Sequence, residues 1–181
     1  MVPERFHLSQ NEEKALYDIH QNNPEDLGYR KFLSRTVTPL LQRLARQRID
    51  EPLGLDFGCG PGPVISEMAK EKGIIIHNYD PYYYHFPELL KNKYDFITMT
   101  EVIEHVVMPH KLLILLSSLM KSDSTLAVMT KRVTSQQNFK NWHYKNDPTH
   151  ICFYSMETFA WIANKFNWQL EEVDKDVVFF Y

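Results

Sequence analysis

The chain has 181 residues, of which 44% are hydrophobic and 24% charged, as is ordinary for one globular domain with a fair-sized core. Lys and Arg number 20 and Asp and Glu 23, so the formal net charge of −3 argues mildly against strong nonspecific binding to nucleic acid, although a local basic patch stays open. The sequence has no signal-peptide pattern, no apolar stretch that would span a membrane and no metal-type cysteine spacing. These features favour a cytoplasmic protein and do not indicate an oligomeric state.

Two helices are predicted before the first strand. Ser9 followed by Glu12 forms a capping box, which predicts a helix to about His20. Apolar residues at helical spacing predict a longer helix from residue 24 or 25 to about residue 48. Pro39 lies inside this second pattern and is expected to kink or split the helix.

The rest of the chain is organised around residues 53–62, which read Leu-Gly-Leu-Asp-Phe-Gly-Cys-Gly-Pro-Gly. The apolar run predicts a buried strand over 53–57, and a helix is predicted over 63–72. Between them, three glycines at every second position favour a tight turn that lets the backbone approach a ligand. Strand, glycine turn and helix together are the layout of a nucleotide site.

The segment from Asp56 to Gly62 resembles the first motif of class I S-adenosylmethionine-dependent methyltransferases, type 11 and type 23, which are related to quinone-pathway O-methyltransferases. The resemblance extends from about Leu53 to the C-terminus. It implies S-adenosylmethionine as cofactor and S-adenosylhomocysteine as product. It also implies that Asp56 and the glycine loop meet the amino-acid end of the cofactor. A dinucleotide fold would prefer Gly-x-Gly-x-x-Gly, but Pro63 stands where the third glycine would be.

A second acid, Asp80, ends the next predicted strand, over residues 74–79, and the resemblance implies that it binds both ribose hydroxyls. The tyrosines that follow it form either a wall for adenine or a patch over an exposed sheet edge. The predicted cofactor residues are Asp56, Gly58, Cys59, Gly60, Gly62, Asp80, Pro81, Tyr82, Thr100 and Glu101. Cys59 is interpreted as a small packing residue and not as a nucleophile.

Only fourteen residues separate Asp80 from Asp95 in the next predicted strand, 94–100. A full class I methyltransferase places a helix, a strand and another helix there, for which this segment is too short. We therefore expect the third strand to be missing. The predicted fold class is α/β, a Rossmann-like three-layer sandwich with a trimmed sheet, a C-terminal antiparallel hairpin and N-terminal cap helices.

The remaining elements follow from local patterns. A helix is expected to begin at Glu101–His105, and Ser155 is expected to cap the last helix. The other predictions are a helix over 110–121, a turn over 121–124, a strand over 126–130, a long functional or disordered segment over 131–155 and a hairpin from 168–173 and 177–181.

The acidic motif at Glu101, Glu104 and His105 resembles two groups of enzymes. In small-molecule O-methyltransferases, including those of quinone pathways, such a motif helps to build the pocket without metal. The small-RNA 2′-O-methyltransferases use Glu, Glu, His and a later His to bind metal. We favour the pocket without metal, with Glu101 and His105 as catalytic candidates.

The loop after residue 130 supplies the other site candidates. Its histidines suit proton transfer because histidine titrates near neutral pH. His150 is the predicted general base, although a hydrogen-bonded loop histidine is almost as good an interpretation. The predicted substrate residues are His143, Tyr144, Asp147, Tyr154 and Arg30, the last of which also fits an ordinary surface arginine.

We predict residues 1–50 as an arm with cap helices and 51–181 as one methyltransferase unit that methylates an oxygen or nitrogen of a small molecule. Two alternatives stay open. A metal-assisted RNA 2′-O-methyltransferase would need a basic face and metal at Glu101, Glu104, His105 and His150. A cofactor-binding scaffold without turnover would need a blocked cleft.

Overall fold

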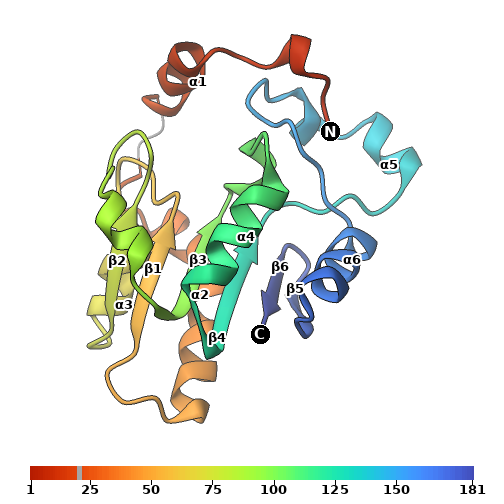
Figure 1. Cartoon of the computed structure of the whole chain (residues 1–181). Coiled ribbons are helices and arrows are strands. Elements are labelled where there is room, and N and C mark those ends of the chain that lie inside the picture. Colours follow the sequence, from red (N-terminus) through yellow and green to blue (C-terminus); the bar gives the residue numbers. More distant parts are fainter. Residues whose placement is uncertain (20–21) are drawn as a thin grey trace.

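The computed structural model describes residues 1–19 and 22–181. A six-stranded sheet in the order β2-β1-β3-β4-β6-β5 forms its centre (Figure 1). The strands are β1 (Leu53–Phe57), β2 (Ile75–Tyr79), β3 (Tyr94–Thr100), β4 (Met120–Met129), β5 (Leu170–Asp174) and β6 (Val177–Phe180). The first four are parallel, whereas β6 is antiparallel to β4 and to β5, so the predicted closing hairpin is confirmed.

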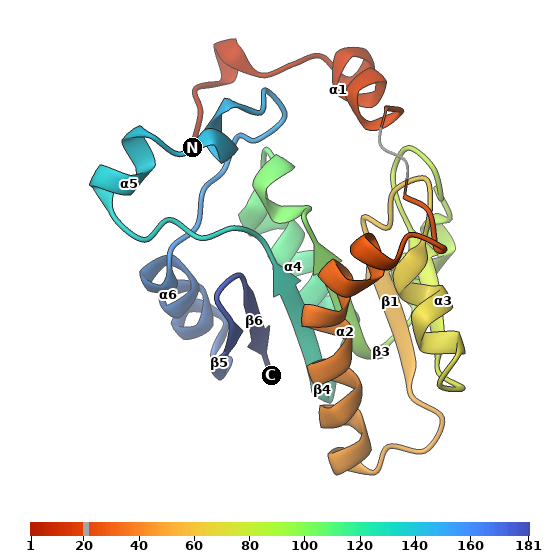
Figure 2. The same ribbon diagram turned by 180° about the vertical axis from the view of Figure 1, so that it is seen from behind.

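Helices cover both faces of the sheet, as predicted for a three-layer sandwich (Figures 1 and 2). On one face, α4 (Pro109–Leu119) and α6 (Met156–Phe166) pack against strand residues such as Ile97. On the other face, α2 (Leu27–Gln47) packs against Phe96, and α3 (Val64–Lys70) packs against α2. Neighbouring residues of a strand point to opposite faces, so these runs of apolar residues fill both layers.

The prediction of a missing third strand is confirmed. β2 is an edge of the sheet, and the described residues 81–93 contribute no strand to it. They hold an isolated bridge between Asp80 and Tyr84 and the 3₁₀ helix η2 (Pro87–Lys91).

The N-terminal helices differ in how they are held. In α1 (Gln10–Tyr17) the Ser9–Glu12 capping box is present as predicted. The predicted end at His20 lies outside the described residues. In α2 the side chain of Asp26 caps the first turn, and the helix continues through Pro39 without the predicted split. Buried residues of α2, such as Leu40, anchor it to the sheet, and this packing outweighs the lost hydrogen bond of proline.

Three predictions near the strand ends need correction. Glu101–His105 does not start a long helix, because only the 3₁₀ turn η3 (Ile103–His105) forms before α4 begins. Residues 121–124 lie within β4, at an irregularity where the register with β3 shifts. The long segment over 131–155 contains α5 (Gln136–Lys140) and η4 (His143–Asn146).

Ser155 caps α6 with a capping box, as predicted. The remaining short helix, η1 (Glu4–Phe6), lies in the N-terminal arm.

No helix of the described segments is long and apolar enough to cross a membrane. The predicted boundary at residue 50 stays a prediction.

Candidate active site

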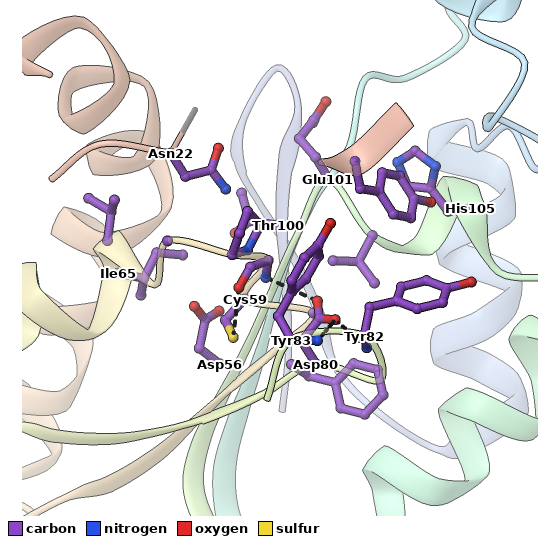
Figure 3. Close-up of a pocket in the computed structure, with 18 of the residues that line it drawn as sticks. Asn22, Asp56, Cys59, Ile65, Asp80, Tyr82, Tyr83, Thr100, Glu101 and His105 are labelled. Atoms are coloured by element: carbon purple, nitrogen blue, oxygen red, sulfur yellow. Dashed lines mark hydrogen bonds between the residues drawn. The ribbon is translucent and has the colours of Figure 1, made fainter. Parts of the chain in front are cut away.

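A cavity of about 720 Å³ opens at the carboxyl ends of the parallel strands (Figure 3). This is the edge at which open α/β sheets bind ligands, and the volume suits a cofactor with a small acceptor. Its lining includes most of the residues predicted from the sequence: Asp56, Gly58, Cys59, Gly60, Gly62, Asp80, Pro81, Tyr82, Thr100, Glu101, His105, Tyr144, Asp147 and His150.

The glycine loop needs glycine at three positions for different reasons. Gly58 and Gly60 have φ values of 77° and 66°, in the left-handed region that other residues avoid. Gly62 has no such φ, but a Cβ there would collide with the backbone carbonyl oxygen of Asn22. Glycine at these positions therefore lets the loop, which lines the cavity, pack closely against Asn22 and Val102.

The two acids of the cofactor motif lie in different environments. Asp56 is 3% exposed and accepts a hydrogen bond of 2.7 Å from the Thr98 hydroxyl; burial raises its pKa to about 7. Asp80 accepts hydrogen bonds from the backbone N–H groups of Gly60 (3.0 Å), Tyr82 (2.8 Å) and Tyr83 (3.2 Å). Asp80 thus joins the glycine loop to the turn after β2, and its carboxylate keeps acceptor capacity for a ligand hydroxyl.

Glu101 follows β3 directly and is held in an unusual backbone conformation. Its φ is 52°, which is uncommon for a residue other than glycine, and its N–H donates to the Met129 carbonyl oxygen over 2.8 Å. Its Oε2 accepts from the Tyr144 hydroxyl over 3.2 Å, whereas its buried Oε1 has no hydrogen-bond partner. Because strained conformations of this kind gather at functional sites, Glu101 is a strong site candidate.

Glu104 is fully buried and is not among the residues that line the cavity, and its backbone carbonyl oxygen accepts from the N–H groups of Ile151 and Cys152, both over 2.8 Å. The Tyr144 hydroxyl donates to Glu104 Oε1, while Oε2 has no partner. Burial, with the nearby Glu101, raises the pKa of Glu104. Tyr144 therefore links the two glutamates that follow β3.

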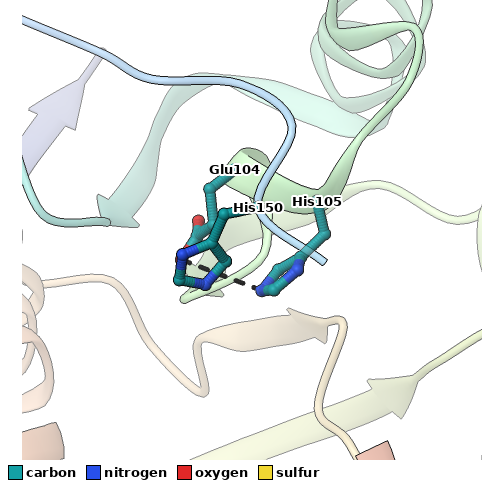
Figure 4. Close-up of side chains that lie close together, drawn as sticks. All are labelled: Glu104, His105 and His150. Carbon is teal, nitrogen blue, oxygen red and sulfur yellow. Dashed lines mark ion pairs between the residues drawn. The ribbon is translucent and has the colours of Figure 1, made fainter. Parts of the chain in front are cut away.

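The rings of His105 and His150 lie 4.7 Å apart between centroids (Figure 4). The Nδ1 of His105 is 3.1 Å from the Thr149 carbonyl oxygen, and the Nδ1 of His150 is 2.7 Å from the Tyr144 carbonyl oxygen. A carbonyl only accepts, so each neutral ring donates from Nδ1 and carries its lone pair on Nε2. Burial lowers the pKa of His150, which favours this neutral form.

Comparison with known proteins agrees with this geometry. A family model described as a methyltransferase domain matches residues 29–173. The chain belongs to this family. It is an S-adenosylmethionine-dependent methyltransferase, and the predicted resemblance is confirmed. A search of curated proteins found no match.

Solved methyltransferase structures share the fold. A SAM-dependent methyltransferase from Archaeoglobus fulgidus is 25% identical, with a TM-score of 0.53 over 79% of this chain and 76% of that one. Magnesium protoporphyrin IX methyltransferase from Synechocystis PCC 6803, solved with bound SAH, is 14% identical, with a TM-score of 0.54 over 98% and 95% of the two chains. The mitomycin 7-O-methyltransferase MmcR is 14% identical, with a TM-score of 0.57 over 93% and 59%.

Three of the predicted substrate residues lie outside the lining of the methyltransferase cavity. Arg30 pairs with Glu71 over 2.7 Å, which agrees with the alternative of a surface arginine. His143 is exposed at the start of η4, and the buried Tyr154 donates to the Ile103 carbonyl oxygen over 3.2 Å. Their roles in substrate binding stay predictions.

The N-terminal segment of the methyltransferase supplies lining residues that the sequence did not reveal. Glu13 of α1 accepts hydrogen bonds from the hydroxyls of Tyr17 (2.8 Å) and Tyr82 (2.7 Å), and Asn22 lies against Gly62. Tyr17 also contacts His105 edge to face, with centroids 5.5 Å apart. Glu13 and Tyr82 are 69 positions apart, so no local pattern could have paired them.

Proposed function

We propose that this methyltransferase transfers a methyl group from S-adenosylmethionine to an oxygen or nitrogen of a small molecule. The observation that carries the proposal is that the glycine loop and His150 line the same cavity. Its volume of about 720 Å³ also disfavours the scaffold alternative, which needs a blocked cleft.

The residues present fit the cofactor. Gly60 and Gly62 line the cavity with Asp56 alongside, and they would meet the amino-acid end of the cofactor. Asp80 suits the ribose hydroxyls, and Pro81 and Tyr82 form the wall next to it. Thr100 and Glu101 each carry a buried oxygen without a partner, which a ligand at this strand end would satisfy. When bound, S-adenosylmethionine supplies an electrophilic methyl group.

His150 is proposed as the general base. Its Nε2 carries the lone pair, because Nδ1 donates to the Tyr144 carbonyl oxygen. Asp147 Oδ2 lies 3.9 Å from Nε2 and would stabilise the ring once it has taken a proton. The Tyr144 carbonyl thus orients the ring.

Calorimetry with S-adenosylhomocysteine and S-adenosylmethionine tests cofactor binding. The wild type should bind both, and Gly60→Arg should bind neither, because the new side chain fills the loop. Gly73→Arg is the matched control, since Gly73 also has a positive φ, 73°, but has open space around it. Preferential binding of NADH by the wild type would contradict the proposal.

A metal-assisted transfer is the second candidate, favoured by one cluster. Donor atoms of Glu104, His105 and His150 all lie within 4.8 Å of one another, and Glu104 Oε2 has no partner (Figure 4). Imidazole and carboxylate ligands suit a first-row divalent metal ion, which would lower the pKa of a bound acceptor hydroxyl. Calorimetric titration with Mn²⁺ would support this candidate if binding is tight in the wild type and lost in His105→Ala.

The RNA acceptor finds less support than the metal. Among the described residues, no Lys or Arg lines the cavity, whereas an RNA backbone calls for a basic face.

We also propose a cytoplasmic location, which is consistent with two free, buried cysteines. We further propose that the chain divides into residues 1–50, an arm with cap helices, and residues 51–181, the methyltransferase unit.

A further inference from the structure

Apart from two histidines, the charged side chains that line the described cavity are all acidic. The described side chains that line it include five carboxylates and neither Lys nor Arg. Asp56 and Asp80 belong to the side proposed for the cofactor. The other three come from separate elements: Glu13 from α1, Glu101 from the end of β3 and Asp147 from the loop after η4.

Burial raises the pKa of Glu101 to about 7, and the positive charges of Lys131 and Arg35, which do not line the cavity, act against this shift. These and other basic side chains near the site also have partners of their own. Lys14 pairs with Asp18 over 2.8 Å, and Arg35 pairs with Asp174 over 2.7 Å and Asp176 over 2.9 Å. Lys131 lies over the Tyr144 ring, 5.1 Å from its centroid, and does not line the cavity. Within the described lining, the acceptor-side carboxylates therefore face no Lys or Arg, and Asp147 has an imidazole beside it, with His150 Nε2 at 3.9 Å.

The acceptor-side carboxylates are also fixed in place. Tyrosine hydroxyls hold both oxygens of Glu13, and Thr149 donates to Asp147 Oδ1 through its N–H (2.9 Å) and its hydroxyl (2.6 Å). Glu101 is held by its left-handed backbone, and its buried Oε1 has no hydrogen-bond partner (Figure 3). An oriented, buried acceptor without a donor calls for a ligand N–H or O–H group.

Aromatic rings complete the acceptor side. Tyr17, Tyr29, Phe32 and Tyr144 line the same cavity. The faces of such rings attract cations, and their edges and faces also pack against flat apolar groups. Carboxylates and rings together are the chemistry that recognises an organic ammonium group.

We propose that the acceptor is a small molecule that bears a protonated amine, held by Glu101 with Glu13 and Asp147. The inference rests on the proposed function and names its substrate class. It excludes acceptors that would place a carboxylate or phosphate in this part of the cavity, because like charges in a partly buried site repel strongly.

The test measures binding to the protein loaded with S-adenosylhomocysteine, so it needs no turnover. Three probes share a phenol ring and differ in charge: tyramine is cationic, 4-ethylphenol neutral and 4-hydroxyphenylacetate anionic. By calorimetry, tyramine should bind at least about tenfold more tightly than the anion, with the neutral probe between them. Glu101→Gln should reduce the preference for tyramine over 4-ethylphenol, and Asp147→Asn is a second variant with the same expectation.

Glu12→Gln is the matched control. Glu12 is an exposed carboxylate of α1 outside the cavity lining, and glutamine can keep its capping role, so the preference should not change. Equal or tighter binding of the anion, no binding of tyramine, or an unchanged preference in both cavity variants would overturn the inference. Failure of the wild type to bind S-adenosylhomocysteine would instead count against the proposed function.

Discussion

Replacing Gly58 by alanine should destabilise the fold in two ways, through backbone strain and through a collision of the new Cβ with Val102. Gly58 has a φ of 77°, and a residue with a Cβ loses about 1–2 kcal/mol in this region. The added Cβ would also lie 2.5 Å from Val102 Cγ2 and 2.9 Å from Cγ1. Overpacking of this kind costs about 1–3 kcal/mol. The expected loss in the free energy of unfolding is therefore about 2–5 kcal/mol.

Urea unfolding of four variants, Gly58→Ala, Val102→Ala, their combination and Gly73→Ala, separates the two parts. Gly73→Ala is the control for backbone strain, because Gly73 has a φ of 73° and no neighbouring heavy atom within 4 Å, so it should lose only about 1–2 kcal/mol. In Gly58→Ala/Val102→Ala the colliding methyl groups are removed, and the two changes should be less than additive.

The same substitution should weaken cofactor binding. Gly58 and Val102 both line the cavity, and Val102 is the neighbour of Glu101. A displaced Val102 would move the end of β3, so calorimetry should show lower affinity for S-adenosylhomocysteine in Gly58→Ala and unchanged affinity in Gly73→Ala. The reasoning would be refuted if Gly58→Ala lost no more stability than Gly73→Ala.

Two further predictions concern titratable groups. With any acceptor that the enzyme turns over, His150→Ala should lower kcat by about 10²–10⁴-fold with little change in cofactor affinity. The effects of His150→Ala and Glu101→Gln on kcat should be less than additive when the two are combined. An unchanged kcat in His150→Ala would contradict the assignment of His150 as the base. Burial raises the pKa of Asp56 from 3.8 to about 7, so the folded state binds this proton more tightly than the unfolded state does. The contribution of protonated Asp56 to the free energy of unfolding is therefore fully present below pH 3.8 and is lost as the pH rises to about 7. Without cofactor, the urea midpoint of the wild type should therefore fall more between about pH 5 and pH 7 than that of Asp56→Asn, and equal decreases would contradict the assignment.

Much of the fold follows from patterns that are local in the sequence. A strand was predicted from the apolar run Leu53–Phe57, and a turn was predicted from the glycines that follow it. Both signals are local, because they depend only on the types of neighbouring residues. Ser9 and Ser155 predicted helix starts because a cap and its partner are three positions apart. The missing strand followed from the family resemblance together with length, since the residues between Asp80 and Asp95 are too few for the helix, strand and helix of a full methyltransferase.

Local signals were weakest where long-range contacts decide the structure. Pro39 is a helix breaker by propensity, yet α2 continues because its buried face packs on the sheet. Glu101 to His105 looked helical by composition, but Glu101 takes a left-handed backbone whose N–H donates to the Met129 carbonyl of the neighbouring strand.

By itself the sequence determined the family, the glycine loop and the order of the six described strands along the chain, because each depends on residues that lie close together along the chain. Only the tertiary structure decided what faces the glycine loop across the cavity. It placed Glu13 against Tyr82, linked Glu101 to Glu104 through Tyr144 and turned the Nδ1 atoms of the two site histidines to backbone carbonyls. These groups come from segments far apart in the sequence. Their chemistry is set by their burial and by their hydrogen-bond partners, and both arise only when the segments pack together.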